Sequence, residues 1–147
     1  MIWLFDVNVL LAIADSHHAF HDAIHHWLDQ RHGQTWASCP ITENAFVRTL
    51  AQPKYASGQR SPAEGLELLR QLRSARSLKH VFWPGAVSLA DSHRINAEHL
   101  VTAKQVTDVY LAAHAHSRKA RLVTFDRGVA WQAVVGATAD LIEVPAL

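Results

Sequence analysis

Residues 2–5, Ile-Trp-Leu-Phe, form a short run without a polar side chain, and Asp6 follows at once. An unbroken apolar run of this length is typical of a strand buried on both faces of a parallel sheet. Parallel strands need crossover connections, which are usually helices. Leu10, Leu11 and Ala14 then recur at helical spacing, so a short helix is predicted after Asp6. This pattern favours folds that alternate strands with helices.

The rest of the chain continues the alternation. Apolar runs predict further strands at 36–38, 81–83, 121–125 and 141–144. Apolar spacing, capping residues and prolines predict helices at 18–32, from Pro40 to near Pro53, from Ser61 onward, at 87–90, at 105–117 and from Val129. Strands alternating with helices imply right-handed βαβ units. We therefore expect an α/β fold, a three-layer α/β/α sandwich with a central, mostly parallel sheet, and a single domain over residues 1–147.

Composition limits the compartment and the partners. Cys39 is the only cysteine, which excludes an internal disulfide and a cysteine-based zinc ribbon, and a cytoplasmic location is expected. The first residues lack the basic region of a secretory signal, and no apolar run approaches the about 20 residues of a membrane helix. Fourteen Lys and Arg against thirteen Asp and Glu leave a net charge of +1. This excludes a uniformly basic nucleic-acid coat, but it does not exclude opposite patches that cancel.

Four acidic residues stand where the carboxyl ends of the strands should lie, which is where sites form in such sheets. They are Asp6 after the first strand, Glu43 in the first turn after the second, Asp108 near the start of helix 105–117, and Asp126 after strand 121–125. Each alone is explained as a helix cap or as a first-turn acid. Together they would repel each other unless a cation lay among them, and Mg²⁺ or Mn²⁺ prefers oxygen ligands. The set is consistent with hydrolysis of a phosphodiester bond by a metal-activated water.

Four segments of the chain resemble the PIN domain and, more narrowly, the VapC toxins of bacterial type II toxin–antitoxin pairs. They are Asp6-Val7-Asn8 after an apolar strand, Glu43 on the helix after the second strand, residues 107–113 (TDVYLAA) and residues 122–128 (LVTFDRG). The resemblance extends from Asp6 to Arg127 and preserves the order and rough spacing of the four acids. It implies a PIN-like sandwich and a magnesium- or manganese-dependent endoribonuclease.

The resemblance also implies roles for single residues. The catalytic acids would be Asp6, Glu43, Asp108 and Asp126. Asp6 and Asp108 would be direct metal ligands, whereas Glu43 and Asp126 would complete the shell directly or through water. Two further positions, Asn8 and Thr124, correspond to polar residues that orient these acids or the bound waters.

The resemblance further implies partners. A small VapB-like antitoxin would block the acidic pocket, and the protein would be a homodimer. The alternative is a non-catalytic PIN-like module that binds RNA or another protein. Such a module would have no physical reason to tolerate the repulsion among four carboxylates.

A basic segment follows the second predicted strand and its helix. Arg70, Arg73 and Arg76 recur every three residues, which places them on one face of the helix that starts after Ser61. We expect this stripe to contact the RNA backbone, with Arg48 as a second candidate, and binding would then depend on salt. The alternative interpretation is an ordinary solvated helix face.

Histidines are unusually frequent, eleven in all, and His17, His21 and His25 are spaced by four. Two histidines at this spacing can bind zinc on a helix. The His-Glu-x-x-His pattern is absent, so a solvated helix face is favoured over a zinc site.

Overall fold

The computed structural model describes residues 1–85 and 87–147. In this part of the chain five strands form one sheet in the order β3-β2-β1-β4-β5, and each strand pairing is parallel. The strands are β1 (Ile2–Phe5), β2 (Thr35–Ser38), β3 (Lys79–Phe82), β4 (Arg121–Val123) and β5 (Ile142–Glu143). The apolar strand β1, predicted at residues 2–5, therefore lies at the centre of the sheet. The five predicted strands are confirmed, with shifted ends.

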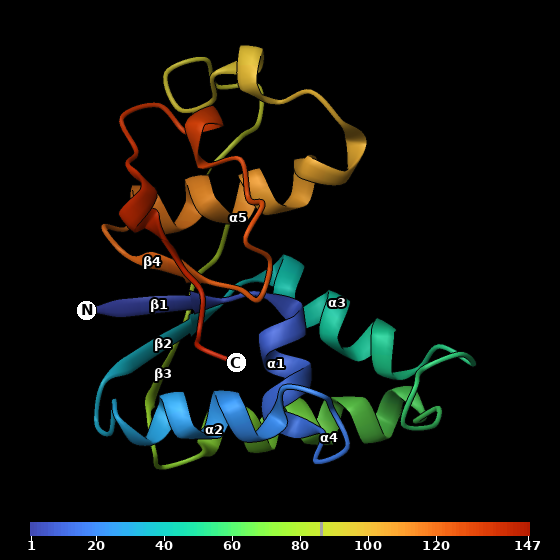
Figure 1. Ribbon diagram of the computed structural model, residues 1–147. Coiled ribbons are helices and arrows are strands. Elements are labelled where there is room, and N and C mark those ends of the chain that lie inside the picture. The colour runs from blue at the N-terminus through green and yellow to red at the C-terminus, as the bar shows by residue number, and fades with distance from the viewer. Residues whose placement is uncertain (86) are drawn as a thin grey trace.

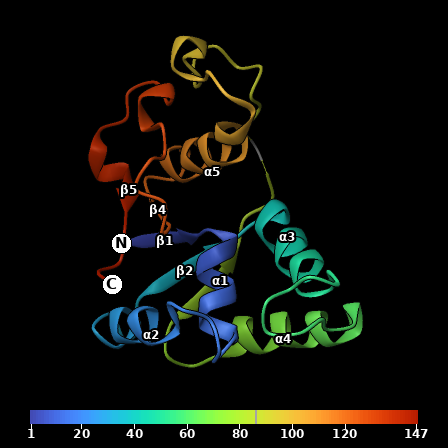
Figure 2. The ribbon, with the colours of Figure 1, turned by 45° about the vertical axis from the view of Figure 1, so that its right-hand side comes forward.

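Helices cover both faces of this sheet (Figures 1 and 2). On one face lie α1 (Val7–Ala14), α2 (His21–Asp29) and α4 (Pro62–Ser74), and on the other lies α5 (Val106–Ser117). The remaining helix, α3 (Pro40–Leu50), follows β2 and packs against α4 and α1. Short 3-10 turns at Ala97–His99, Ala103–Gln105, Trp131–Ala133 and Ala139–Leu141 join α5 in the second layer. The predicted α/β/α sandwich is confirmed, whereas the division into domains stays a prediction.

The two faces of the sheet bury two different sets of side chains, because successive residues of a strand point to opposite sides. Phe5 and Trp36 face α1 and α2, and their rings stack with centroids 5.2 Å apart. Leu4, Ala37 and Leu122 face α5 and are fully buried. Burial of both faces explains why β1 carries no charged residue and why Leu122 and Val123 of β4 are apolar.

Local signals set the start of the helices that position the acidic residues. The hydroxyl of Ser61 accepts a 3.1 Å hydrogen bond from the backbone N–H of Glu64, and Pro62 is the first residue of α4. At the start of α3, Pro40 takes the same place, and the hydroxyl of Thr42 accepts a 3.0 Å bond from the backbone N–H of Cys39. The first cap holds the start of α4, and the second holds the first turn of α3, which carries Glu43.

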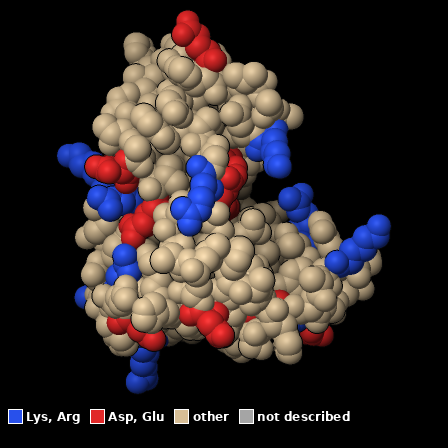
Figure 3. Space-filling model, in the orientation of Figure 1, with Lys and Arg blue, Asp and Glu red and all other residues tan. Residues whose placement is uncertain are grey.

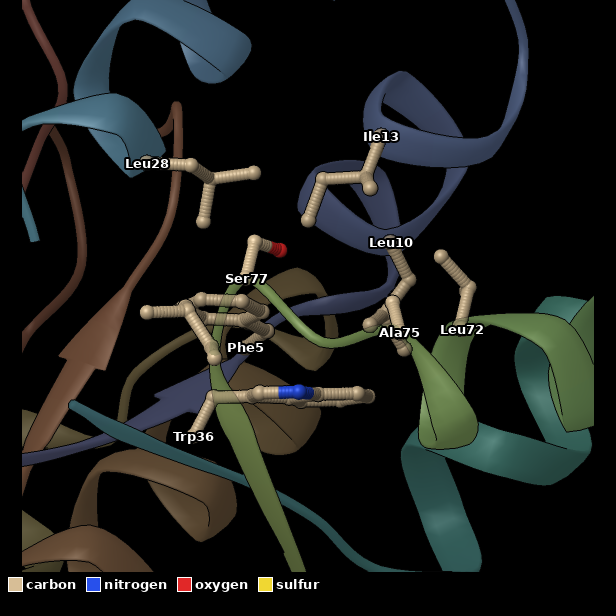
Figure 4. Close-up of a pocket in the computed structure, with 9 residues that line it drawn as sticks. Phe5, Leu10, Ile13, Leu28, Trp36, Leu72, Ala75 and Ser77 are labelled. Carbon is tan, nitrogen blue, oxygen red and sulfur yellow. The ribbon is translucent and has the colours of Figure 1, made fainter. Parts of the chain in front are cut away.

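A small apolar cavity lies between the sheet and the end of α4 (Figure 4). Its volume is about 30 Å³, and it is lined by Phe5, Leu10, Ile13, Leu28, Trp36, Leu72, Ala75, Ser77 and Leu78. Among these residues, only Ser77 and the indole nitrogen of Trp36 offer polar side-chain groups. The remaining lining side chains are apolar, so this cavity is a packing defect of the core and not a binding site.

Two predicted helices are wrong. Residues 87–90 hold only a turn, because Val87 alone is buried there while Leu89 is exposed, which leaves no apolar face for a helix to bury. The helix predicted from Val129 is replaced by the 3-10 turn Trp131–Ala133. The segment that follows instead forms an antiparallel bridge between Ile95 and Val134. No helix within residues 1–85 and 87–147 has the length and apolarity needed to cross a membrane.

Candidate active site

Asp6 lies at the carboxyl end of the central strand and caps α1. Its Oδ1 atom accepts a 2.7 Å hydrogen bond from the backbone N–H of Val7, and its Oδ2 atom accepts a 2.9 Å bond from the hydroxyl of Thr124. The residue is only 7% exposed. Both carboxylate oxygens are therefore oriented by the fold, one from each of two neighbouring strand ends.

Thr124 also positions the second acid of this edge. It stands one residue beyond β4, and its hydroxyl accepts a 3.1 Å bond from the backbone N–H of Asp126. The Oδ1 atom of Asp126 in turn accepts a 2.7 Å bond from the backbone N–H of Gly128. This turn leaves Asp126 exposed beside the buried Asp6.

Asp108 comes from the first turn of α5, whose N-terminal end lies at the same edge of the sheet (Figure 1). It borders a hollow of about 230 Å³ that is also lined by Asp126 and Lys104. Figure 3 shows acidic surface at the notch between the part of the molecule around α5 and the part around α3, with basic side chains on both sides. The sequence reasoning missed Lys104. Its position four residues before Asp108 would have indicated that the two side chains lie close together.

Two of the aspartates at this edge, Asp6 and Asp108, have raised pKa values. The pKa of Asp108 is raised to about 6, most strongly by burial and further by the charges of Asp6 and Asp126, while the charge of Lys104 lowers it in part. Burial likewise raises the pKa of Asp6, the bonds from Thr124 and Val7 lower it in part, and the charge of Asp126 raises it further. Carboxylates in this state gain from a cation placed among them.

The fourth predicted acid has different partners. The Oε2 atom of Glu43 accepts a 2.5 Å hydrogen bond from the hydroxyl of Ser38, and a guanidinium nitrogen of Arg73 lies 3.4 Å from each carboxylate oxygen. Glu43 borders the hollows between α3 and α4, whereas Asp108 and Asp126 border the hollow beside α5. The structure thus brings three of the four acids into mutual interaction and ties the fourth to α4.

Ser38 and His80 support Glu43, and sequence reasoning missed both. Ser38 ends β2 and is fully buried, and its oxygen also lies 2.8 Å from Nε2 of His80 on β3. Because Ser38 donates its only proton to the carboxylate, Nε2 of His80 must donate to Ser38. Burial, with the nearby charge of Arg73, lowers the pKa of His80 to about 4, so the ring is neutral at physiological pH. Ser38 could have been predicted from the sequence, because it is a polar residue at the end of a buried strand.

The donor set of the acidic edge fits a hard divalent cation. Its ligand atoms are carboxylate oxygens, which Mg²⁺ and Mn²⁺ prefer. Within the described ranges, no three His, Cys, Asp or Glu side chains approach closely enough to enclose a metal ion by themselves. Mg²⁺ usually keeps several waters and binds through one or two carboxylates, so a set led by Asp6 and Asp108 is compatible with it.

The remaining predicted residues fall into separate places. Arg70 and Arg73 line a hollow beside Glu43, and Arg48 lines the adjoining one. Arg76 lies beyond Ser74, the last residue of α4, so the predicted three-residue stripe is broken after Arg73. Asn8 is exposed on the first turn of α1, and its role stays a prediction.

Two of the spaced histidines, His21 and His25, form hydrogen bonds with the end of α1. Nδ1 of His21 donates a 2.7 Å bond to the carbonyl of Ala12, and Nε2 of His25 donates a 3.0 Å bond to the carbonyl of Ile13. Both carbonyls belong to the last turn of α1 and have no partner within that helix. These two histidines therefore act as donors at a helix C-terminus.

Comparisons with known proteins agree with this architecture. Residues 3–134 match the family model described as the PIN domain. The chain is 44% identical over 135 residues to ribonuclease VapC44 of Mycobacterium tuberculosis, covering 92% of this chain and 93% of that protein. It is 38% identical over 126 residues to ribonuclease VapC38 of the same organism, covering 86% of each. Its fold is similar, at 15% identity and a TM-score of 0.61, to a chain in the crystal structure of VapBC2 from Rickettsia felis bound to a promoter DNA fragment, covering 99% of this chain and all of that one.

Proposed function

The chain belongs to the PIN-domain family, among its VapC members, and from this premise we propose that it is a metal-dependent endoribonuclease, the toxin of a VapBC-type pair. The proposed catalytic residues are Asp6, Glu43, Asp108 and Asp126. The observation that carries the proposal is the group of three aspartates at the carboxyl edge of the sheet, two of which have raised pKa values. A fold gains no stability from such a group, so a bound cation is the physical reason for it.

We propose that Asp6 and Asp108 hold Mg²⁺ or Mn²⁺, and that Asp126 and Glu43 complete the shell directly or through water. When bound, such an ion neutralises a phosphodiester and lowers the pKa of a coordinated water. The chain supplies orientation: Thr124 and the N–H of Val7 hold the two oxygens of Asp6 in fixed directions. Lys104 lies beside Asp108 and offers a positive charge to the RNA backbone at the mouth of the hollow.

The proposed partner is a VapB-like antitoxin that covers the acidic edge. It is supported by the VapC names of the relatives and by the likeness to a chain of a VapBC assembly. We propose a cytoplasmic location, which the single cysteine of the chain supports. The predicted homodimer stays a prediction.

The decisive experiment compares Asp6→Asn with the wild-type protein on structured RNA, in Mg²⁺ or Mn²⁺ and in chelator. We expect cleavage by the wild type only with metal, and a fall of at least about 100-fold in the initial rate for the variant. The matched control is Asp29→Asn, which removes one exposed carboxylate at the end of α2, near the amino ends of the strands. This control should cleave at the wild-type rate.

Equal cleavage by wild type and Asp6→Asn, or cleavage that survives the chelator, would contradict the proposal. Binding of RNA without cleavage under either metal would favour the non-catalytic module. Mn²⁺ binding, measured by titration calorimetry, should weaken in Asp6→Asn and Asp108→Asn but not in Asp29→Asn.

A further inference from the structure

Glu43 borders two adjoining hollows between α3 and α4, which we call the α3–α4 groove. The hollows measure about 520 and 730 Å³, and they share Glu43, Leu66 and Leu69 as lining residues. The smaller one is cationic, with Arg70, Arg73, Ser74 and His80 around Glu43. The larger one is mainly apolar and includes the ring of Phe82.

Arg73 is placed to exchange one anionic partner for another. Its nitrogen lies at 3.4 Å from both oxygens of Glu43, which is long for a charged pair, and 42% of its side chain is exposed. Exposed ion pairs of this kind are weak. The guanidinium fork matches a phosphate as well as a carboxylate.

An exposed aromatic ring adds a second contact for RNA. Phe82 ends β3 and is 40% exposed, and the guanidinium of Arg73 lies 5.5 Å from the centre of its ring. A cationic groove beside an exposed aromatic ring is the combination that binds unpaired nucleotides, with bases stacked and phosphates neutralised. An acidic peptide would use the arginines but would gain little from the ring.

We propose that the α3–α4 groove binds the RNA strand beside the scissile phosphate, and that Arg73 leaves Glu43 to take one of its phosphates. The inference rests on the proposed function, because it assigns a substrate subsite to the same enzyme. When Arg73 moves, Oε2 of Glu43 keeps its bond from Ser38, whereas Oε1 loses its partner. Arg73 is thus a positioning residue, which withholds one oxygen of Glu43 until RNA is bound.

The test measures binding of a short fluorescein-labelled single-stranded RNA in chelator, where the proposed chemistry cannot occur, over a range of salt concentrations. For single strands the slope of log K against log salt changes by about 0.7 for each phosphate neutralised. Arg73→Ala should reduce the slope by about 0.7 and weaken binding about tenfold. Arg73→Lys should restore the slope but only part of the affinity, because an ammonium lacks the fork.

The matched control is Lys79→Ala, which removes one exposed positive charge at the amino end of β3, outside the groove. Its salt slope should equal that of the wild type. Phe82→Leu should weaken binding several-fold without changing the slope, because stacking releases no counterions. Equal losses in Arg73→Ala and Lys79→Ala would assign the effect to net charge and overturn the proposal.

The exchange itself is tested by a double-mutant cycle in the same assay. Glu43→Gln should tighten RNA binding several-fold in the wild-type background, because the competing carboxylate is gone, and have almost no effect in Arg73→Ala. An equal gain in both backgrounds would mean general repulsion and would overturn the exchange. Wild-type RNA binding by Arg73→Ala, together with lost binding of a polyglutamate peptide, would assign the groove to a protein partner.

The two proposals fail separately. A protein that shows these slopes but cleaves no RNA in either metal contradicts the nuclease assignment and leaves the groove as an RNA site. Normal cleavage with unchanged slopes contradicts the groove alone.

Discussion

Two buried aspartates flank the same helix, and their surroundings push them in opposite directions. Asp6 caps the start of α1 and Asp15 caps its end. They are 7% and 2% exposed. Yet the pKa of Asp6 is raised and that of Asp15 is lowered. Both side chains are shielded from solvent, but Asp6 is surrounded by more protein, so burial raises its pKa more strongly.

Hydrogen-bond donors and neighbouring charges widen the difference between the two pKa values. Burial acts to raise the pKa of Asp15, but the hydroxyls of Ser57 and Tyr55, each at 2.6 Å, outweigh it, and the backbone N–H of His17 and the charge of Arg60 act in the same direction. This carboxylate ties the 55–60 loop to α1. It is fully satisfied by the chain and has a structural role.

Asp6 has two donors, Thr124 and the N–H of Val7, and faces the charge of Asp126 instead of an arginine. Hydrogen-bond donors and a nearby arginine thus stabilise the charged form of Asp15 at the end of α1, but Asp6 at its start has no nearby arginine. The comparison teaches that the chain balances the negative charge of the acidic edge only in part. That is the condition in which a cation binds.

The largest expected effect on stability separates these two aspartates. Asp15→Asn should lower the free energy of unfolding by about 2–4 kcal/mol, because the amide leaves some donors of this buried site unpaired. Asp6→Asn, in chelator, should leave stability unchanged or raise it, because it removes a repelled charge. Urea unfolding followed by circular dichroism measures both. A smaller loss in Asp15→Asn than in Asp6→Asn would reverse the comparison.

A smaller effect is the pH dependence of the metal-free protein. A carboxyl group whose pKa is raised on folding favours the folded state below its ordinary pKa of 3.8, and loses this contribution as the pH rises through about 6. Asp108 should therefore cost about 1–2 kcal/mol of stability between pH 4 and pH 7 in chelator. Asp15 acts with the opposite sign, since its contribution is present above the ordinary pKa and is lost as the pH falls.

Asp108→Asn is the variant that isolates this contribution. The difference in unfolding free energy between variant and wild type should grow from pH 4 to pH 7 and shrink when Mn²⁺ is added. A difference that stays constant across this range would show that Asp108 is not repelled in the folded protein.

The smallest effect concerns the link between the strand ends. Thr124→Val removes the hydroxyl that donates to Asp6 and should cost about 1 kcal/mol of stability. It should also raise the pKa of Asp6 further, so that the acid limb of the cleavage profile moves to higher pH. Thr124→Ser retains the hydroxyl and should restore the profile. A profile that is the same in all three proteins would give Thr124 a packing role only.

Local sequence patterns determined most of the fold. The apolar run before Asp6 predicted a central buried strand, and Ser61 with Pro62 predicted the start of α4. Both signals act within a few residues, where strand periodicity and helix capping decide the structure. The helix predicted from Val129 failed because long-range pairing of Ile95 with Val134 decides the backbone there. The helix predicted at 87–90 failed because Val87 alone is buried in that segment.

The sequence by itself also determined that Asp6 and Asp126 stand at the carboxyl ends of strands, because an acid that follows an apolar strand has only that edge to occupy. Only the tertiary structure decided their partners. Glu43 is joined to Arg73, thirty residues away, and Glu143 accepts bonds from Trp3 and Arg31, more than a hundred residues away. No spacing rule relates side chains on elements that meet only through packing. The physical reason is range: capping and periodicity are local, whereas the charge that a carboxylate experiences comes from whatever the folded chain places beside it.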